Sequence, residues 1–413
     1  MLLNKNVPFI KNAISIPGSL NIKTLSAGTV SAIICCTGPV LIIITAAQNG
    51  NLLPGQTISW LFGIYFIGGL LGILMPLLFG HPIAGAYSIP AAVLMTQAIT
   101  QYSFHEAVGA YLIAGLLIFI IGFLGWYEKL LTWLPSELVM AMIAGSMIHF
   151  GSEMIHSVTM LPLLGSITLL TYFLFAKFSN IPPIVGAAIV GFSLFPFLNQ
   201  SSEKVEFMFA LPSIWMPDFS VNAIFAISIP IAVMLLGTEA AQGITALKDE
   251  GFQPKVNKII MINGIGTMFA GMFGGHSACN GGIMTALCAA KDVGPMETRY
   301  AAAFVSGVWL MIFGLLASLS LSVILIMPIS LIKLIAGLAL IGVLLTSLQR
   351  SFHGKQFQMG AFFTLIIAMS GVSFLGISAT FWALIGGWVV SWFLENKDFK
   401  KRVSSRAVIL KTA

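Results

Sequence analysis

The strongest constraint on the fold is the recurrence of long apolar stretches that contain almost no charge. A helix needs about 20 mostly apolar residues to cross a bilayer. Soluble domains carry roughly 25% charged residues, whereas only 8% of the residues of this chain are charged. Too little polar surface is left to face water, which excludes a soluble enzyme, a nucleic-acid-binding protein and a secreted disulfide scaffold. We predict an all-α polytopic membrane protein in contact with the lipid bilayer.

Apolar stretches bounded by charges or by Gly and Pro clusters predict fourteen membrane spans. The first seven spans are expected at 27–47, 58–78, 82–99, 107–127, 137–149, 161–176 and 183–198. The second seven are expected at 223–247, 259–273, 276–290, 301–325, 328–348, 359–375 and 381–394. Basic residues favour cytoplasmic loops, and with a cytoplasmic N-terminus this count places 18 of the 20 basic residues inside. We therefore expect both termini to be cytoplasmic.

The two halves of the chain resemble each other at a nearly constant offset. The Ala-Ala-Gln triplet that ends at Gln48 matches the one that ends at Gln242, and the Gly-His pair at 80–81 matches the pair at 275–276. Because each half contains an odd number of spans, the second half enters the membrane from the opposite side. Inverted repeats of this kind build secondary transporters. The predicted divisions are a cytoplasmic lead-in (1–26), a first repeat (27–198), an external connection (199–222), a second repeat (223–394) and a basic cytoplasmic tail (395–413).

The third and tenth spans contain residues that interrupt helices. Two prolines and a glycine lie within 82–90, and the stretch 274–282 is rich in Gly, Ser and Asn. Proline breaks a helix interior but is tolerated in the first turn, and Ser and Asn favour helix N-caps. We predict extended segments at 82–87 and 277–279, each followed by a half-helix, with caps near Ser88 and Asn280.

Such broken segments are suited to binding an anion. Backbone without helical hydrogen bonds at membrane depth must be buried in protein or line a cavity, and helix N-termini offer N–H groups and a positive dipole end. Tyr87, Ser88, Ser277, Asn280 and Gly281 are therefore predicted to contact substrate. The alternative is that the glycines only allow close packing of helices.

Glu239 is the acidic residue that falls well inside a predicted span. An intramembrane acid is costly and indicates function, and burial favours the uncharged form, which suits a group that loads and releases a proton. We predict that Glu239 couples transport to protons and that Thr238 and Gln242 beside it bind substrate. The alternative is a protonated acid that only supports helix packing.

Two other titratable residues are weaker candidates. Histidine exchanges protons near neutral pH, so His276 at the start of the tenth span is predicted to take part in proton coupling, unless it is a packing residue. Lys333 is the cation within a span, where it could attract an anionic substrate or extend its ammonium group to the membrane surface.

Four stretches carry a resemblance to a known family. They are Ala-Gln-Gly at 241–243 leading into Lys-Asp-Glu-Gly-Phe at 248–252, Met-Thr-Ala-Leu-Cys at 284–288, Ile-Ala-Gly-Leu-Ala-Leu at 335–340 and Ser-Ala-Thr-Phe-Trp at 378–382. There the chain resembles the benzoate:proton symporter (benzoate membrane transport) family over nearly its whole length.

The resemblance implies a seven-plus-seven inverted-repeat fold shared with nucleobase:cation symporters and sulfate permeases. Spans 1–4 and 8–11 would form a core domain, and spans 5–7 and 12–14 a gate. It also implies proton-coupled symport of a small aromatic carboxylate such as benzoate by alternating access, in the bacterial inner membrane, by a homodimer. The proton would be the coupling ion, with no cofactor, no metal and no enzyme activity.

The sequence departs from the family in span 8. The family usually has Ser-Gln-Asn-Ala-Pro-Gly there, whereas this chain has Thr-Glu-Ala-Ala-Gln-Gly at 238–243. The acid, together with Asn-Gly-Gly-Ile-Met at 280–284, is more similar to nucleobase symporters, so a nucleobase or another weak acid is an alternative substrate. Two lower alternatives are an anion channel and an intramembrane hydrolase that uses His149, Glu153 and His156 as zinc ligands.

Overall fold

The computed structural model describes residues 8–178, 181–198 and 210–399. The elements of the first half are α1 (Pro8–Ser19), α2 (Ile22–Asn49), α3 (Pro54–Phe79), β1 (Gly85–Ala86), α4 (Ile89–Ala98), α5 (Phe104–Phe123), α6 (Tyr127–Trp133), α7 (Ser136–Met160), α8 (Pro162–Phe178) and α9 (Pro183–Leu198). Those of the second half are α10 (Val221–Ala223), η1 (Ile224–Ser228), α11 (Ile229–Met234), η2 (Leu235–Ala240), α12 (Ala241–Asp249), α13 (Val256–Met272), β2 (Cys279–Asn280), α14 (Gly282–Ala289), η3 (Lys291–Val293), α15 (Tyr300–Leu315), α16 (Ala317–Leu325), α17 (Ile329–Phe352), α18 (Gln358–Ser370) and α19 (Ala379–Leu394). The segments η1 and η2 are π-helical, and η3 is a 3₁₀ turn.

The chain is a mostly helical, polytopic membrane protein. Within the described residues, six helices are long and apolar enough to cross a membrane: α2, α3, α5, α7, α17 and the continuous segment from α10 to α12. The pair α15 and α16, bent by 66°, adds a seventh, and α4, α8, α9, α18 and α19 are apolar helices of 10–17 residues. Every predicted span coincides with one of these helices or with α13 or α14. The count of fourteen spans and their orientation stay predictions.

Three features differ from the expectation. The predicted lead-in contains α1, which packs against α3. Helix α7 continues to Met160, well past the predicted end at residue 149, and in this extension Glu153 pairs with Lys333 of α17. The predicted eleventh span is bent between α15 and α16. Parts of the lead-in (1–7), of the external connection (199–209) and of the tail (400–413) lie outside the described residues.

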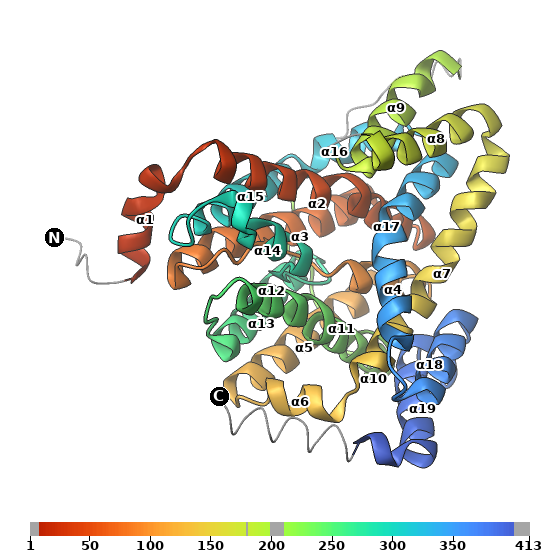
Figure 1. Ribbon diagram of the computed structural model, residues 1–413. Helices are drawn as coiled ribbons and strands as arrows, with labels where there is room; N and C mark the ends of the chain where they lie inside the picture. Colours follow the sequence, from red (N-terminus) through yellow and green to blue (C-terminus); the bar gives the residue numbers. More distant parts are fainter. Residues whose placement is uncertain (1–7, 179–180, 199–209, 400–413) are drawn as a thin grey trace.

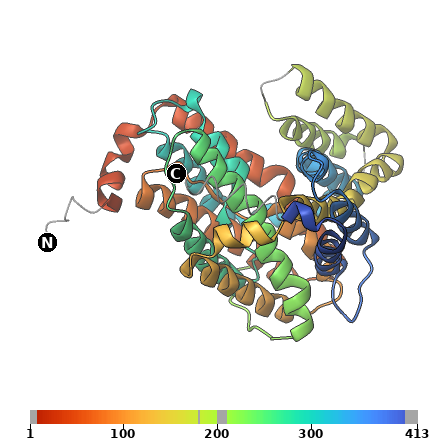
Figure 2. The same ribbon diagram turned by 60° about the horizontal axis from the view of Figure 1, so that its bottom comes forward.

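The helices form two groups (Figure 1), with α2, α3, α5, α13 and α15 on the left and α7–α9 with α17–α19 on the right, and the view in Figure 2 separates them in the same way. Within these groups α3 packs along α15, α5 packs along α13, and α7 packs along α17. Predicted span 2 thus lies beside span 11, and span 4 beside span 9. The inverted repeat that would relate these two pairs stays a prediction. The division into a moving core and a gate stays a prediction.

The extended segments predicted in spans 3 and 10 are confirmed, and they pair with each other. Strands β1 and β2 are antiparallel, with Gly85 opposite Asn280 and Ala86 opposite Cys279. A Cβ atom on Gly85 would collide with the backbone of Gly68 and Gly72 on α3, so glycine is required for this close approach.

Both half-helices begin directly after the paired strands. The Ser88 side chain caps α4 by accepting a hydrogen bond from the Ala91 N–H at 3.3 Å, as predicted. Gly281 caps α14 without a side-chain bond, one residue after the expected Asn280, because the Asn280 side chain is bonded to Asn263 instead. The two half-helix N-termini therefore lie on either side of one short two-stranded sheet.

Candidate functional site

The π-helical turn η2 positions Glu239 within the segment from α10 to α12. A π-helical turn is wider than an α-helical one and is frequent at functional sites. Thr238, also on η2, donates its hydroxyl hydrogen to the Met234 carbonyl oxygen at 2.6 Å, so this hydrogen bond stays within the helix. Gln242 follows on α12, and both Glu239 and Gln242 face the cavity described below.

The Glu239 carboxyl group lies at the N-termini of both half-helices. The Gly282 N–H, in the first turn of α14, donates a hydrogen bond to Glu239 Oε2 at 3.0 Å. The backbone N–H of Ile89, at the start of α4, also interacts with this carboxyl group. Free N–H groups at helix N-termini favour negative charge, and the Glu239 carboxyl group occupies the position that was predicted to receive an anion.

Asn280 bonds to the backbone of Glu239 and does not line the cavity. Its amide nitrogen donates to the Glu239 carbonyl oxygen at 3.2 Å. Its side-chain oxygen accepts from Asn263 Nδ2 at 2.6 Å, and its backbone N–H donates to Asn263 Oδ1 at 2.9 Å. The side chain of Asn280 therefore fixes β2 against η2 and α13.

His276 is fully buried and bonded at both ring nitrogens. Trp60 Nε1–H donates to His276 Nδ1 at 3.0 Å, and because indole is only a donor, Nδ1 carries no hydrogen. The hydrogen is then on Nε2, which donates to the Ser88 carbonyl oxygen at 3.0 Å. Adding a proton to Nδ1 would break the bond to Trp60. In this tautomer His276 connects α3 to the residue that caps α4, and its part in proton coupling stays a prediction.

Ser88 and Ser277 also connect the broken segments. The Ser88 N–H donates to Ser277 Oγ at 3.0 Å, and both residues are fully buried. Their polar groups are therefore used within the protein, which positions α4 relative to β2.

A cavity of about 150 Å³ opens beside Glu239, between the half-helices and helices α7 and α17. Its lining is mostly apolar. The lining residues are Ile34, Cys35, Ala86, Tyr87, Ile89, Pro90, Met140, Ile143, Thr238, Glu239, Gln242, Gly281, Gly282, Ile283, Met284, Gly342, Val343, Thr346, Ser347 and Arg350.

Tyr87 contributes its ring to this cavity. Its hydroxyl lies 2.9 Å from the Tyr65 hydroxyl, and Tyr65 donates its own hydrogen to the Cys35 carbonyl oxygen at 2.9 Å. Tyr87 must then be the donor to Tyr65, so its hydroxyl hydrogen is not available to a substrate. The ring also packs edge-on against His276, with centroids 5.6 Å apart.

The structure brings five of the predicted site residues to the cavity and leaves five outside its lining. Those lining it are Tyr87, Thr238, Glu239, Gln242 and Gly281, and those outside the lining are Ser88, His276, Ser277, Asn280 and Lys333. The sequence-based prediction missed the contribution of α7 and α17. The available signal was the spacing of Thr346, Ser347 and Arg350, which places them on one face of a helix.

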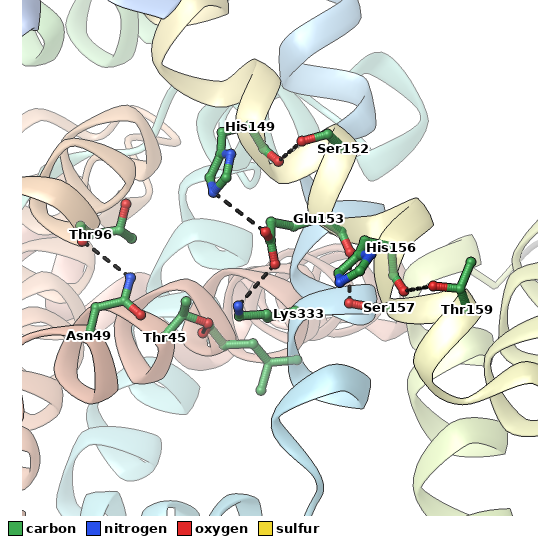
Figure 3. Close-up of polar contacts among 11 residues, drawn as sticks. Thr45, Asn49, Thr96, His149, Ser152, Glu153, His156, Ser157, Thr159 and Lys333 are labelled. Atoms are coloured by element: carbon green, nitrogen blue, oxygen red, sulfur yellow. Dashed lines mark hydrogen bonds and ion pairs between the residues drawn. The ribbon is translucent and has the colours of Figure 1, made fainter. Parts of the chain in front are cut away.

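Lys333 lies away from the cavity and is paired (Figure 3). Its Nζ is 2.9 Å from Glu153 Oε2, and Glu153 Oε1 is 3.7 Å from His149 Nε2. The ammonium group is therefore balanced by a carboxylate of α7, and attraction of an anionic substrate by Lys333 stays a prediction. His149, Glu153 and His156, considered above as zinc ligands, do not form a metal-binding group, and none with three His, Cys, Asp or Glu side chains occurs among the described residues.

Solved structures share this architecture. The chain is similar to the transmembrane domain of a cyanobacterial bicarbonate transporter, BicA, with a TM-score of 0.60, 16% identity, and coverage of 90% of this chain and 97% of that one. It is also similar to SLC26A9, with a TM-score of 0.63, 13% identity, and coverage of 92% and 67%. At these identities the likeness concerns the fold alone.

Sequence comparison identifies relatives along most of the chain. The benzoate membrane transport protein of Acinetobacter baylyi is 28% identical over 370 residues, which is 89% of this chain and 94% of that protein. The inner membrane protein YdcO of Escherichia coli is 27% identical over 369 residues, with the same coverage. The family model for the benzoate membrane transport protein matches residues 18–393. The chain therefore belongs to the benzoate membrane transport family, whose members are membrane transporters and not enzymes.

Proposed function

We propose that the protein carries a small aromatic carboxylate such as benzoate across the bacterial inner membrane together with a proton, by alternating access. The observation that carries this proposal is the hydrogen bond from the Gly282 N–H to the Glu239 carboxyl group beside an apolar cavity. The family and the anion-transporting neighbours of the same fold support an anionic substrate.

The coupling follows from competition for the N–H groups at the half-helix N-termini, above all that of Gly282. While Glu239 is ionised, its carboxylate accepts from Gly282 and repels a second carboxylate at the half-helix N-termini. Protonation removes this charge and weakens the acceptor, so the substrate carboxylate can replace it at Gly282. One proton and one anion are then bound together, and the loaded site carries no more charge than the empty one.

The apolar lining suits an aromatic ring. Met140 and Ile143 of α7 face the cavity from one side and Val343 of α17 from another, while Tyr87 offers its ring. A ring buried among these side chains is stabilised by the removal of apolar surface from water, while the carboxylate is directed to the half-helix N-termini. Proton coupling is assigned to Glu239 alone, and His276, Ser88, Ser277 and Asn280 position the segments that bind the anion.

A nucleobase is the second candidate substrate, because Glu239 and Gln242 both line the cavity. An acid and an amide side by side can accept and donate hydrogen bonds at the edge of a heterocycle. In that case the substrate would bind through its ring nitrogens and carbonyl groups, and the half-helix N-termini would not receive a carboxylate.

Uptake into proteoliposomes distinguishes the two substrates. Labelled benzoate, uracil and xanthine are compared with and without an inward proton gradient, at pH above 7. Carboxyl groups of this type have a pKa of about 4, so only about one molecule in a thousand is then uncharged and able to diffuse through the lipid. Protein-free liposomes measure that diffusion.

We expect protein-dependent uptake of benzoate that the gradient accelerates, and no such uptake of uracil or xanthine. Gradient-driven uptake of a nucleobase without benzoate uptake would replace the proposal by its alternative. Benzoate uptake at the same rate with and without the gradient would contradict proton coupling.

A further inference from the structure

The cavity carries one acidic and one basic side chain among its described lining residues, Glu239 and Arg350. Glu239 lies at the half-helix N-termini, whereas Arg350 lies near the end of α17 and is exposed. The distribution of basic residues assigns this end of α17 to the cytoplasm. Arg350 is therefore located where the cavity meets the solution on the expected cytoplasmic side.

Helix α17 carries a cation near each end, and the two differ in their surroundings. Lys333 is paired with Glu153 at 2.9 Å. Arg350 has no ion-pair or hydrogen-bond partner among the described residues. Its guanidinium group is thus free to bind an anion, whereas the ammonium group of Lys333 is already neutralised.

The face of α17 that leads from Arg350 into the cavity carries hydroxyl groups near the mouth of the cavity. Thr346 and Ser347 lie one turn before Arg350 and line the same cavity. Neither hydroxyl group has a hydrogen-bond partner among the residues that the structure describes, although Ser347 is buried. This face therefore offers two hydroxyl groups that line the cavity next to an unpaired guanidinium group.

We infer that Arg350, Thr346 and Ser347 form a second anion subsite, which binds the carboxylate of the substrate at the cytoplasmic mouth of the cavity. A guanidinium group binds a carboxylate through two parallel hydrogen bonds, and the hydroxyl groups bind its oxygens on the way to Glu239. The subsite would hold the anion before it reaches, or after it leaves, the half-helix N-termini. The inference rests on the proposed function for the identity of the anion.

Chemical modification of the wild-type protein tests the subsite directly. Inverted membrane vesicles expose the expected cytoplasmic face to phenylglyoxal, which reacts with guanidinium groups, and peptide mass spectrometry measures the modified fraction of Arg350. Arg402 in the tail is the internal reference. Benzoate at ten times its half-saturating concentration should slow modification of Arg350 about tenfold, and the neutral analogue benzamide should not.

Exchange of labelled for unlabelled benzoate, with saturating substrate on the opposite side, tests the role of Arg350 in transport. Arg350→Gln should raise the half-saturating concentration on the cytoplasmic face about fivefold to tenfold, with the maximal rate unchanged. Arg350→Lys keeps the charge but loses the paired hydrogen bonds, so its effect should be smaller. Lys355→Gln, at an exposed residue that does not line the cavity, is the matched control and should have no effect.

The outcomes separate this inference from the proposed function. Benzoate transport without protection of Arg350 would overturn the subsite and leave the transport proposal standing. Protection without benzoate transport would support the subsite and overturn the transport proposal. A lower maximal rate in Arg350→Gln with an unchanged half-saturating concentration would reduce Arg350 to a structural residue.

Discussion

Replacing Glu239 by glutamine should remove the pH dependence of benzoate binding while leaving binding itself intact. Glutamine has the shape of a protonated carboxyl group, and its side-chain oxygen can still accept the hydrogen bond that Gly282 donates at 3.0 Å. It cannot acquire the negative charge that excludes a second carboxylate. The variant therefore represents the protonated state of the site at every pH.

The size of the effect follows from the competition at Gly282. If benzoate binds only when Glu239 is protonated, the Kd of the wild-type protein rises about tenfold for each pH unit above the pKa of Glu239, which is about 1.4 kcal/mol per unit. Two pH units change the Kd about a hundredfold in the wild-type protein. In Glu239→Gln the Kd should be the same at all these pH values, because no ionisation precedes binding.

Isothermal titration calorimetry with benzoate at several pH values gives the Kd for the wild-type protein and for Glu239→Gln. Glu153→Gln is the matched control, because Glu153 is an acid that pairs with Lys333 away from the cavity. It should keep the wild-type pH dependence. A wild-type Kd that does not change with pH, or a pH dependence that persists in Glu239→Gln, would refute the competition.

The remaining predictions concern the broken segments and are measured by thermal unfolding in nanodiscs, with benzoate binding as a second readout. Trp60→Phe should lower the free energy of unfolding by about 1–3 kcal/mol, because His276 Nδ1 loses its hydrogen-bond donor. An unchanged free energy of unfolding would contradict the assigned tautomer. Tyr87→Phe should lower the free energy of unfolding by about 0.5–1.5 kcal/mol without changing the Kd for benzoate. A large loss of benzoate affinity would show that the Tyr87 hydroxyl reaches the substrate. Gly85→Ala should destabilise the fold by about 1–3 kcal/mol through its clash with α3, and wild-type stability would contradict that close approach.

The sequence was sufficient to predict the breaks in spans 3 and 10 and the intramembrane acid. Proline and glycine act on the backbone locally, so Pro82, Gly85 and Pro90 are enough to exclude a continuous helix. Glu239 stands out because charge is rare in apolar stretches. Both signals depend on neighbours in the sequence, and the structure confirms the extended segments, whereas the pairing of β1 with β2 was not predicted.

The orientation of individual side chains depends on contacts between distant segments and could not be predicted. The donor to His276 is Trp60, more than 200 residues earlier in the chain, so the neighbours of His276 in the sequence do not indicate this hydrogen bond. The π-helical turn η2 shifts the register of Glu239 and Gln242, and no residue type marks such a turn reliably. Arg350 is one of the 18 basic residues that the predicted topology assigns to the cytoplasmic side, and its place at the cavity depends on how α17 packs against the half-helices.

The most direct test of the central claim is to count the protons taken up when benzoate binds. Purified protein in weakly buffered solution, at a pH where Glu239 is ionised, is mixed with benzoate in the presence of a pH indicator, and the bound benzoate is measured in parallel. The account predicts that the wild-type protein takes up one proton for each benzoate bound and that Glu239→Gln takes up none. Benzoate binding to the wild-type protein without proton uptake, or equal uptake by the variant, would contradict it.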